Sequence, residues 1–502
     1  MTRFLLASSI CIAMAACGPS RNSEKACVGT DCASGSCTSG DVRDCYTGDS
    51  STDNVGLCHG GMQTCNSAGQ WDTCEGEVTP TGEVCGDNMD NDCDGQVDED
   101  TDNDGDGYTT CQGDCCDNPT ECSNPGLVNP GAFDVAGNGV DDDCDGVVDN
   151  PPVNCDSGLS SNSSNAMDYA KAIDLCQQVD AMGNVAGKMY GPRWGVVSAT
   201  LTKADGTALN SAQSVQHSIR PHYGTGTMPQ AGASLIELST GNAAATSDTN
   251  PGPDVEEDGA FGQSSPFPSD WYTANGSKLP NAPGCPAPSG DTANDPVMLT
   301  LSIRVPTNAS SFSLGLNFFS SEFPEWTCSP YNDFFVVLLD SMWSGMPANP
   351  TDKNLALYTQ TSTMKKYPVG VNLAFGNTGL FTQCINGNIG CDGTAGTIST
   401  CMSTAELAGT GMDQPDLGGG CSGGDTELGG GTGWLTTSGN VKAGEIMKLR
   451  IAIWDTSDDA LDSLAVIDNF LWSVQSSDPG TVIQARPPSA PVTVEPVSRL
   501  EQ

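Results

Sequence analysis

Positive charge is scarce in this sequence. Its 502 residues include 19 Lys and Arg against 63 Asp and Glu, a formal net charge of −44, and no Lys or Arg lies between Arg43 and Lys171. Because nucleic acids and anionic membrane surfaces attract proteins through basic patches, this composition argues against nucleic acid as a partner. The crowded carboxylates indicate either bound cations or a solvated acidic surface, and their spacing decides between the two.

Histidine and the common catalytic motifs are also scarce. The sequence has three His, and His217 and His222 lie five residues apart rather than the four of a helical zinc pair. Neither H-E-x-x-H nor G-x-x-x-x-G-K-[ST] occurs. The G-x-S-x-G match around Ser422 lies in a glycine-rich stretch, without the strand and helix that flank a nucleophile elbow. We therefore predict that the protein is not an enzyme.

Long apolar runs are missing except at the start of the chain. Residues 4–16 form an apolar run that follows Arg3 and is too short to span a bilayer. The run ends in MAACG, which resembles the bacterial lipobox with Met14 in place of the usual Leu. We predict a signal peptide over residues 1–16 and lipidation of Cys17; an ordinary secretory signal is the alternative. Because Gly18 is not the Asp that retains lipoproteins on the inner membrane, we expect the cell envelope, at the outer membrane or cell surface.

Cysteines are abundant and agree with export. Of the 24 cysteines, 22 remain when Cys11 and Cys17 are set aside. Fourteen lie in residues 27–144 and eight in residues 155–421, so each region can close its bridges alone. Disulfides persist outside the reducing cytosol, although their pairing cannot be read from spacing.

Composition divides the chain into five parts. Residues 17–44 and 476–502 are polar, and residues 45–150 are too poor in apolar residues for an ordinary core. Residues 155–475 hold every Trp except Trp71. We predict a signal peptide (1–16), a lipidated cysteine with a flexible tether (17–44), Cys- and Asp-rich metal-binding repeats (45–150), a large domain (155–475) and a disordered tail (476–502).

The large domain has the pattern of a β-protein. Its short apolar runs are bounded by Gly, Pro, Asn and Asp, and one helix is predicted over residues 166–178. The predicted strands cover residues 194–201, 297–305, 312–319, 334–339, 448–454 and 464–474. We predict a mainly β fold, with a β-sandwich or jelly-roll-like large domain preceded by a small disulfide-rich, calcium-loop module with little regular secondary structure.

An internal repeat lies within residues 45–150. Residues 80–99 read PTGEVCGDNMDNDCDGQVDE and residues 130–150 read PGAFDVAGNGVDDDCDGVVDN, so that Asp141 corresponds to Asp90, 51 residues earlier. The second copy has no counterpart of Cys85. A local bridge from Cys85 to Cys93 is therefore possible in the first copy only.

Three carboxylate ladders in this region predict cation sites. Calcium takes about six to eight oxygen ligands, which alternate acids supply as a loop winds, and a glycine at the sixth position allows the sharp turn. The expected ligands are Asp90, Asp92, Asp94, the carbonyl of Gln96 and Asp98; Asp141, Asp143, Asp145, the carbonyl of Val147 and Asp149; and Asp102, Asp104, Asp106, the carbonyl of Tyr108 and, one place beyond the usual twelfth, Asp114.

Three alternatives accompany this prediction. The ladders could form an acidic linker that binds cations diffusely, or the ions could act in signalling rather than in folding. We favour a folding role because binding energy becomes folding energy where an apolar core is lacking. Copper is the weaker candidate metal, because it prefers ligands such as His59, Met62 or a modified Trp71, whereas the ladders offer only oxygen.

Two family resemblances support this organisation. Residues 45–150 resemble the metal-binding repeats of MopE-type bacterial surface proteins, whose name implies copper. The sequences SSEFPEWTCSPYNDFFVVLLD (320–340) and ASLIELSTGNAAA (233–245) resemble the choice-of-anchor L domain. This second resemblance implies a surface domain carried by an attachment device, here the N-terminal lipid, and implies no catalytic residues.

The large domain also contains clustered acids that could hold calcium or simply cap turns. They are Glu322, Glu325, Asn332 and Asp333, and Asp455, Asp458, Asp459, Asp462 and Asp468.

We predict a non-catalytic cell-surface lipoprotein that displays a β-sandwich for adhesion or recognition of an extracellular protein or glycan. The alternative is a secreted hydrolase, for example glycan-directed, that uses Asp455, Asp459 and Asp462.

Overall fold

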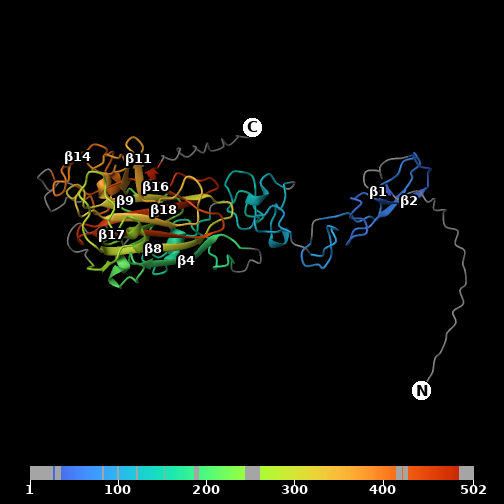
Figure 1. The fold of residues 1–502 in the computed structure, drawn as a ribbon, viewed down its shortest axis with the longest axis horizontal. Coiled ribbons are helices and arrows are strands. Elements are labelled where there is room, and N and C mark those ends of the chain that lie inside the picture. The colour runs from blue at the N-terminus through green and yellow to red at the C-terminus, as the bar shows by residue number, and fades with distance from the viewer. Residues whose placement is uncertain are drawn as a thin grey trace, which may run out of the picture. The chain divides into compact units, whose positions relative to one another are not determined.

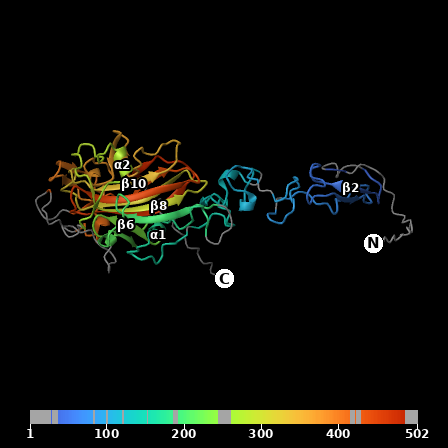
Figure 2. The same cartoon turned by 60° about the horizontal axis from the view of Figure 1, so that its bottom comes forward.

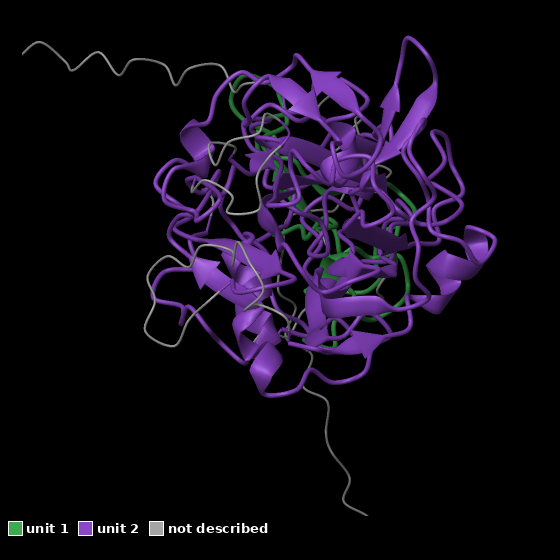
Figure 3. Cartoon of the chain, turned by 90° about the vertical axis from the view of Figure 1, so that its left-hand side faces the viewer, with its two compact units in different colours: residues 1–103, 109–111 green, residues 104–108, 112–502 purple. Residues whose placement is uncertain are grey.

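The computed structural model describes residues 27–28, 36–81, 84–98, 101–119, 122–151, 153–185, 192–243, 261–413, 421 and 428–484. The predicted signal peptide and Cys17 lie outside these ranges. The chain divides into two compact units, residues 1–103 with 109–111 and residues 104–108 with 112–502 (Figure 3). None of the helices in the described ranges combines the length and the apolar character needed to span a bilayer.

The first unit is built on one small sheet and on disulfides. Strand β1 (Cys27–Val28) pairs in parallel with β2 (Val42–Tyr46), which pairs antiparallel with β3 (Gly61–Thr64). The described bridges are Cys37–Cys65, Cys45–Cys74, Cys58–Cys93 and Cys85–Cys111. The local bridge from Cys85 to Cys93 is therefore wrong, since each cysteine bonds to a distant partner. These long-range cross-links stabilise a unit that buries few apolar side chains.

The second unit consists mainly of two antiparallel sheets, whose strands are labelled in Figure 1. The five-stranded sheet has the order β10-β17-β8-β4, with β7 paired to β8; its strands are β4 (Gly195–Thr202), β7 (Ser264–Ser265), β8 (Ala293–Arg304), β10 (Phe334–Asp340) and β17 (Ile446–Thr456). The seven-stranded sheet has the order β19-β16-β9-β18-β6-β5, with β15 paired to β9; its strands are β5 (His217–Arg220), β6 (Leu235–Ser239), β9 (Ser311–Ser320), β15 (Gly430–Gly431), β16 (Leu435–Asn440), β18 (Ser463–Ser473) and β19 (Gly480–Ile483).

Smaller elements surround these sheets. Two hairpins are formed by β11 (Leu357–Gln360) with β12 (Lys365–Pro368) and by β13 (Gly387–Ile389) with β14 (Gly396–Ile398). The α-helices are α1 (Ala166–Ala172), which contacts β4 and β6, and α2 (Ser269–Ala274), which lies on the β10 side of the sheets (Figure 2). The 3-10 helices are η2 (Thr110–Gln112), η3 (Pro125–Leu127), η4 (Ala212–Val215), η5 (Val371–Leu373) and η6 (Ala405–Leu407).

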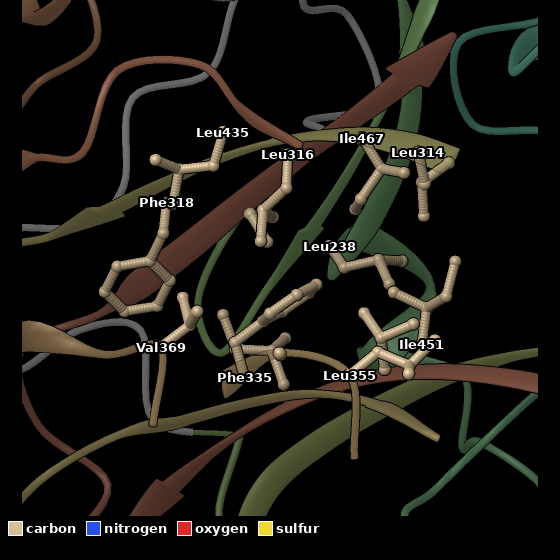
Figure 4. Close-up of a cluster of buried hydrophobic side chains, with 14 of the residues drawn as sticks. Leu238, Leu314, Leu316, Phe318, Phe335, Leu355, Val369, Leu435, Ile451 and Ile467 are labelled. Atoms are coloured by element: carbon tan, nitrogen blue, oxygen red, sulfur yellow. The ribbon is translucent and has the colours of Figure 1, made fainter. Parts of the chain in front are cut away.

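The main core lies between the two sheets. Figure 4 shows Leu316 of β9 and Ile467 of β18 directed toward Phe335 of β10 and Ile451 of β17, and all four are fully buried. Side chains from two facing sheets that interdigitate in this way define a β-sandwich. The mainly β fold is thus confirmed, and the two sheets remain open rather than closing into a barrel.

The outer face of the five-stranded sheet is buried as well. In β10, Phe335, Val337 and Leu339 belong to the main core. The intervening Phe334, Val336 and Leu338 belong to a second cluster on the outer face of the sheet. Trp271 of α2 covers this outer cluster and packs edge-on against Trp454, with ring centroids 5.4 Å apart. A strand buried on both faces reads as a continuous apolar run, which explains FFVVLL.

Most of the predicted elements are confirmed, but the helix ends earlier than predicted and the large domain ends later. The six apolar runs form β4, β8, β9, β10, β17 and β18. The helix is shorter than predicted, because Asp174 turns left-handed (φ 72°) and Cys176 is tied to Cys155. The domain extends past residue 475, because Thr481 of β19 is buried and its hydroxyl lies 2.9 Å from that of Thr437 in β16.

The boundary between the units falls inside the predicted 45–150 module. Residues 112–150 belong to the second unit, where backbone and side-chain hydrogen bonds join them to the turn between β8 and β9. Thr307 N donates to Gly131 O at 3.0 Å, and the amide side chain of Asn308 bonds both the N–H and the carbonyl of Phe133 at 3.0 and 2.8 Å. The two copies of the repeat therefore belong to different units.

Candidate metal sites

The first ladder gathers three carboxylates in an irregular loop of the first unit. Asp90, Asp92 and Asp94 each offer one oxygen, and these oxygens lie within 4.8 Å of one another. Gly95 follows with φ +99°, a backbone conformation that residues other than glycine strongly disfavour. Its amide donates to Asp90 Oδ2 at 3.1 Å, and the amide of Gln96 donates to Asp94 Oδ1 at 2.8 Å. The loop thus winds around a point that faces three carboxylates.

An earlier loop buries the first ladder's leading acid. Leu57 N donates to Asp90 O at 3.0 Å, and Asp90 is 5% exposed. A Cβ on Gly56 would lie 2.4 Å from Asp90 Cγ, so only glycine fits there. The role of Gly56 could not be predicted from the sequence, because no local pattern marks a contact with such a distant residue.

The second ladder repeats this geometry in the second unit. Oxygens of Asp141, Asp143 and Asp145 lie within 4.8 Å of one another. Gly146 has φ +92°, and its amide donates to Asp141 Oδ2 at 2.9 Å. The amide of Val147 donates to Asp145 Oδ1 at 2.9 Å. The sequence repeat is therefore a structural repeat with matching turns.

The acid at the ninth position of the first two ladders does not join the carboxylate cluster, contrary to the prediction. Asp98 and Asp149 both adopt left-handed backbone, with φ 51° and 53°, and neither belongs to its carboxylate cluster. Asp98 accepts hydrogen bonds from the amides of Gly86 and Asn88, and Asp149 accepts from the equivalent loop, with Gly137 N at 2.6 Å. These acids fasten the loop that precedes each ladder. Coordination by the carbonyls of the seventh position stays a prediction.

The third ladder is completed by a more distant acid. Oxygens of Asp104, Asp106 and Asp114 lie within 4.8 Å of one another. Tyr108 N donates to Asp106 Oδ1 at 2.8 Å, the same turn as in the other two ladders. The fully buried Asn129, which the sequence analysis missed, donates to Asp106 Oδ2 at 2.7 Å. Asp102, the first acid of this ladder, is exposed and belongs to the first unit.

Each cluster contains a buried carboxylate oxygen that accepts no hydrogen bond. These atoms are Asp90 Oδ1, Asp143 Oδ1 and Asp114 Oδ2. Burial raises the pKa of Asp143 to about 6 and that of Asp114 to about 7. A buried charge without a partner is costly, so each cluster fits a bound cation that supplies the missing partner.

The donor set fits a hard cation better than copper. The three clusters consist of carboxylate oxygens, which suit calcium, magnesium or manganese. Of the alternative copper ligands, Trp71 already has the guanidinium of Arg43 over its ring, 4.2 Å from the centroid. A second cation on that ring would be repelled by the first.

The acids that the sequence singled out in the large domain are mostly buried. Glu322, Glu325, Asn332 and Asp333 are between 1% and 4% exposed, and so are Asp455 and Asp462. Asp468 is fully buried and accepts a hydrogen bond from Ala231 N at 3.3 Å, whereas Asp459 is exposed and Asp458 is partly exposed.

The fold and the clusters define a class: a disulfide-linked β-sandwich protein with acidic loops whose carboxylates converge. Residues 232–469 match the family model of the choice-of-anchor L domain. Residues 80–99 and 124–150, which contain the first two ladders, match the "Putative metal-binding motif" of the MopE type. No curated protein and no solved structure matches the chain. Residues 232–469 are thus similar to a domain family that suggests association with the cell surface and is not a family of enzymes, and two segments within residues 80–150 match a metal-binding motif.

Proposed function

We propose that this chain is a non-catalytic, lipid-anchored surface protein whose acidic ladders bind calcium and whose β-sandwich mediates adhesion or recognition. The observation that carries the calcium proposal is the set of buried oxygens Asp90 Oδ1, Asp114 Oδ2 and Asp143 Oδ1, which accept no hydrogen bond. Calcium is abundant outside cells, where modules of this kind bind it at roughly 0.1–1 mM.

Calcium would act here mainly as a folding ligand. Residues 84–98 and 136–149 form turns and bends without helix or strand, and neighbouring valines such as Val97 and Val148 are more than half exposed. A loop with so little apolar burial must obtain its stability from cross-links and bound ions. The bridges Cys58–Cys93 and Cys115–Cys144 each anchor the cysteine inside a ladder, next to the proposed ion.

The burial of the large-domain acids argues against the hydrolase alternative. Asp455 is 1% exposed and Asp462 is 3% exposed, so a polymeric substrate cannot reach either carboxylate. Asp459 is the exposed one of the three acids, so the three do not form one accessible site. Anchoring through Cys17 rests on the lipobox-like sequence alone, and the partner proposed for the sandwich is an extracellular protein or glycan.

Calorimetric titration of the full chain tests the calcium proposal. We expect heat of binding with Ca²⁺, a smaller stoichiometry after Asp92→Asn and Asp143→Asn, and an unchanged one after Asp72→Asn, which alters an exposed acid outside the ladders. Parallel titrations with Cu²⁺ and Mg²⁺ identify the metal. Calcium stoichiometry that is zero, or that survives both ladder changes, overturns the proposal.

A further inference from the structure

Four acids converge at one end of the β-sandwich, two from the strand ends of each sheet. Glu322 follows β9 and Asp462 precedes β18 in the seven-stranded sheet, whereas Asp333 precedes β10 and Asp455 lies near the end of β17 in the five-stranded sheet. All four are nine-tenths or more buried, with exposures of 2%, 3%, 1% and 1% in that order. These acids are separate from the ladders.

Strand register brings two of these acids face to face. Phe334 of β10 pairs with Trp454 of antiparallel β17, so one further step places Asp333 opposite Asp455. Their carboxyl groups are in contact. Glu322 joins the pair, because its Oε2 lies 3.5 Å from Asp333 N. Like charges directly opposite each other destabilise a sheet, so something must neutralise this group.

The protein supplies almost nothing that does so. Asp333 Oδ2 accepts a hydrogen bond from the Ser463 hydroxyl at 2.6 Å. Both oxygens of Asp455 are buried and accept no hydrogen bond of ordinary geometry, and their polar neighbours are the carboxyl group of Asp333 and the hydroxyl of Thr240. The nearby Thr240 hydroxyl is positioned to donate to Ser463 O, at 3.4 Å.

Basic side chains are placed elsewhere in the same domain. Asp270 and Asp340, which are about one-third exposed, both bond to Lys353 and Arg450. Among the described residues, no ion pair involves Glu322, Asp333 or Asp455. Arg220, the other base in an ion pair of the sandwich, pairs with the buried Glu237 of β6, so the ion pairs of the described residues leave Glu322, Asp333 and Asp455 without a base.

We propose that Asp333 and Asp455, with Glu322 beside them, bind a divalent cation of the calcium class at this end of the sandwich. Oxygens of the three acids do not all lie within 4.8 Å of one another, so the ion would draw the carboxylates closer together than they lie here. The ion would accept the two oxygens of Asp455 as ligands and remove the repulsion between Asp333 and Asp455. Asp458, on the partly exposed turn after β17, lies close enough to act electrostatically on both Glu322 and Asp333. The site would fasten the ends of both sheets together.

The competing explanation is that the acids share protons instead of an ion. Burial raises the pKa of Glu322, Asp333 and Asp455 well above the usual carboxyl range, so the group needs either protons or a cation. The two explanations predict opposite effects of neutralising Asp455. If Asp455 is a cation ligand, neutralising it lowers the melting temperature in the presence of calcium. If the acids share protons, neutralising Asp455 relieves repulsion, and calcium does not change the melting temperature.

The test uses the full chain with the three ladders disabled by Asp92→Asn, Asp106→Asn and Asp143→Asn. We expect this chain to retain about one Ca²⁺, bound with a rise in melting temperature, and to lose both on Asp455→Asn. Asp291→Asn, an exposed acid outside the cluster, is the matched control. If Asp455→Asn does not fold, Glu322→Gln replaces it.

Two results overturn the inference: a ladder-disabled chain that binds no Ca²⁺, or an Asp455→Asn chain that keeps its Ca²⁺ and melts at a higher temperature. Failure of the ladders is seen separately, as equal calcium stoichiometry in the wild-type and ladder-disabled chains.

Discussion

Replacing Gly146 with alanine measures how far calcium organises the second ladder. Gly146 has φ +92°, and a Cβ built on it meets nothing within 4 Å, so the substitution adds backbone strain without a clash. Left-handed backbone costs an L-residue roughly 1–2 kcal/mol. If the loop takes this conformation only when the ion binds, the whole cost falls on the binding equilibrium. We then expect a loss of calcium affinity of roughly 5- to 30-fold.

The assay is calorimetric titration in a chain that carries Asp92→Asn and Asp106→Asn, so that the second ladder is the one left intact. Gly158→Ala is the matched control, because Gly158 also has positive φ (+77°) and open space around its Cβ but lies outside the ladders. We expect this control to lower stability without changing affinity. Wild-type affinity in Gly146→Ala, with an equal loss of stability with and without calcium, would refute the reasoning, because it would mean that the loop is formed before the ion arrives.

Three further predictions concern the rest of the fold. Arg450 holds the pKa of Asp270 below its usual range. The stability that Asp270 contributes is therefore fully present above its unfolded pKa of about 3.9 and is lost as the pH falls through its lower folded pKa. The difference in melting temperature between wild type and Asp270→Asn should accordingly vanish in acid. Phe335→Ala should lower the free energy of unfolding by about 3–5 kcal/mol in denaturant titrations, because the ring is fully buried in the main core. Removing the bridge with Cys58→Ala and Cys93→Ala should destabilise the first unit by about 2–4 kcal/mol and leave the sandwich's melting transition unchanged.

The strands of the sandwich could be predicted from sequence because their apolar runs are long. The run FFVVLL has no polar interruption, since both of its faces are buried, and it became β10. Short strands escaped prediction: Gly480–Ile483 is four residues long, exposes more than half of Val482 and Ile483, and joins the sheet through the register of β16 and through the Thr481 hydroxyl. Such pairing depends on a distant strand, which no local pattern encodes.

The carboxylate clusters were predictable for the same local reason. Alternate acids followed by a glycine fix both the spacing and the turn, so Asp90, Asp92 and Asp94 converge as expected. The role of Asp98 was not predictable, because its acceptance of the Gly86 and Asn88 amides depends on the path of an earlier loop. The disulfide partners escaped for the same reason, since bridges follow the folded path and not the spacing of cysteines.

Hydrogen exchange at the ladder glycines tests the central claim most directly. The amides of Gly95 and Gly146 donate to Asp90 and Asp141, and these bonds persist only while each ladder stays wound. With bridges intact, we expect both amides to be protected in calcium and to exchange rapidly in EGTA, while amides of the central strand β8 exchange slowly in both. Equal protection of the two glycine amides in calcium and in EGTA would contradict the account that the carboxylate ladders are held together by a bound ion.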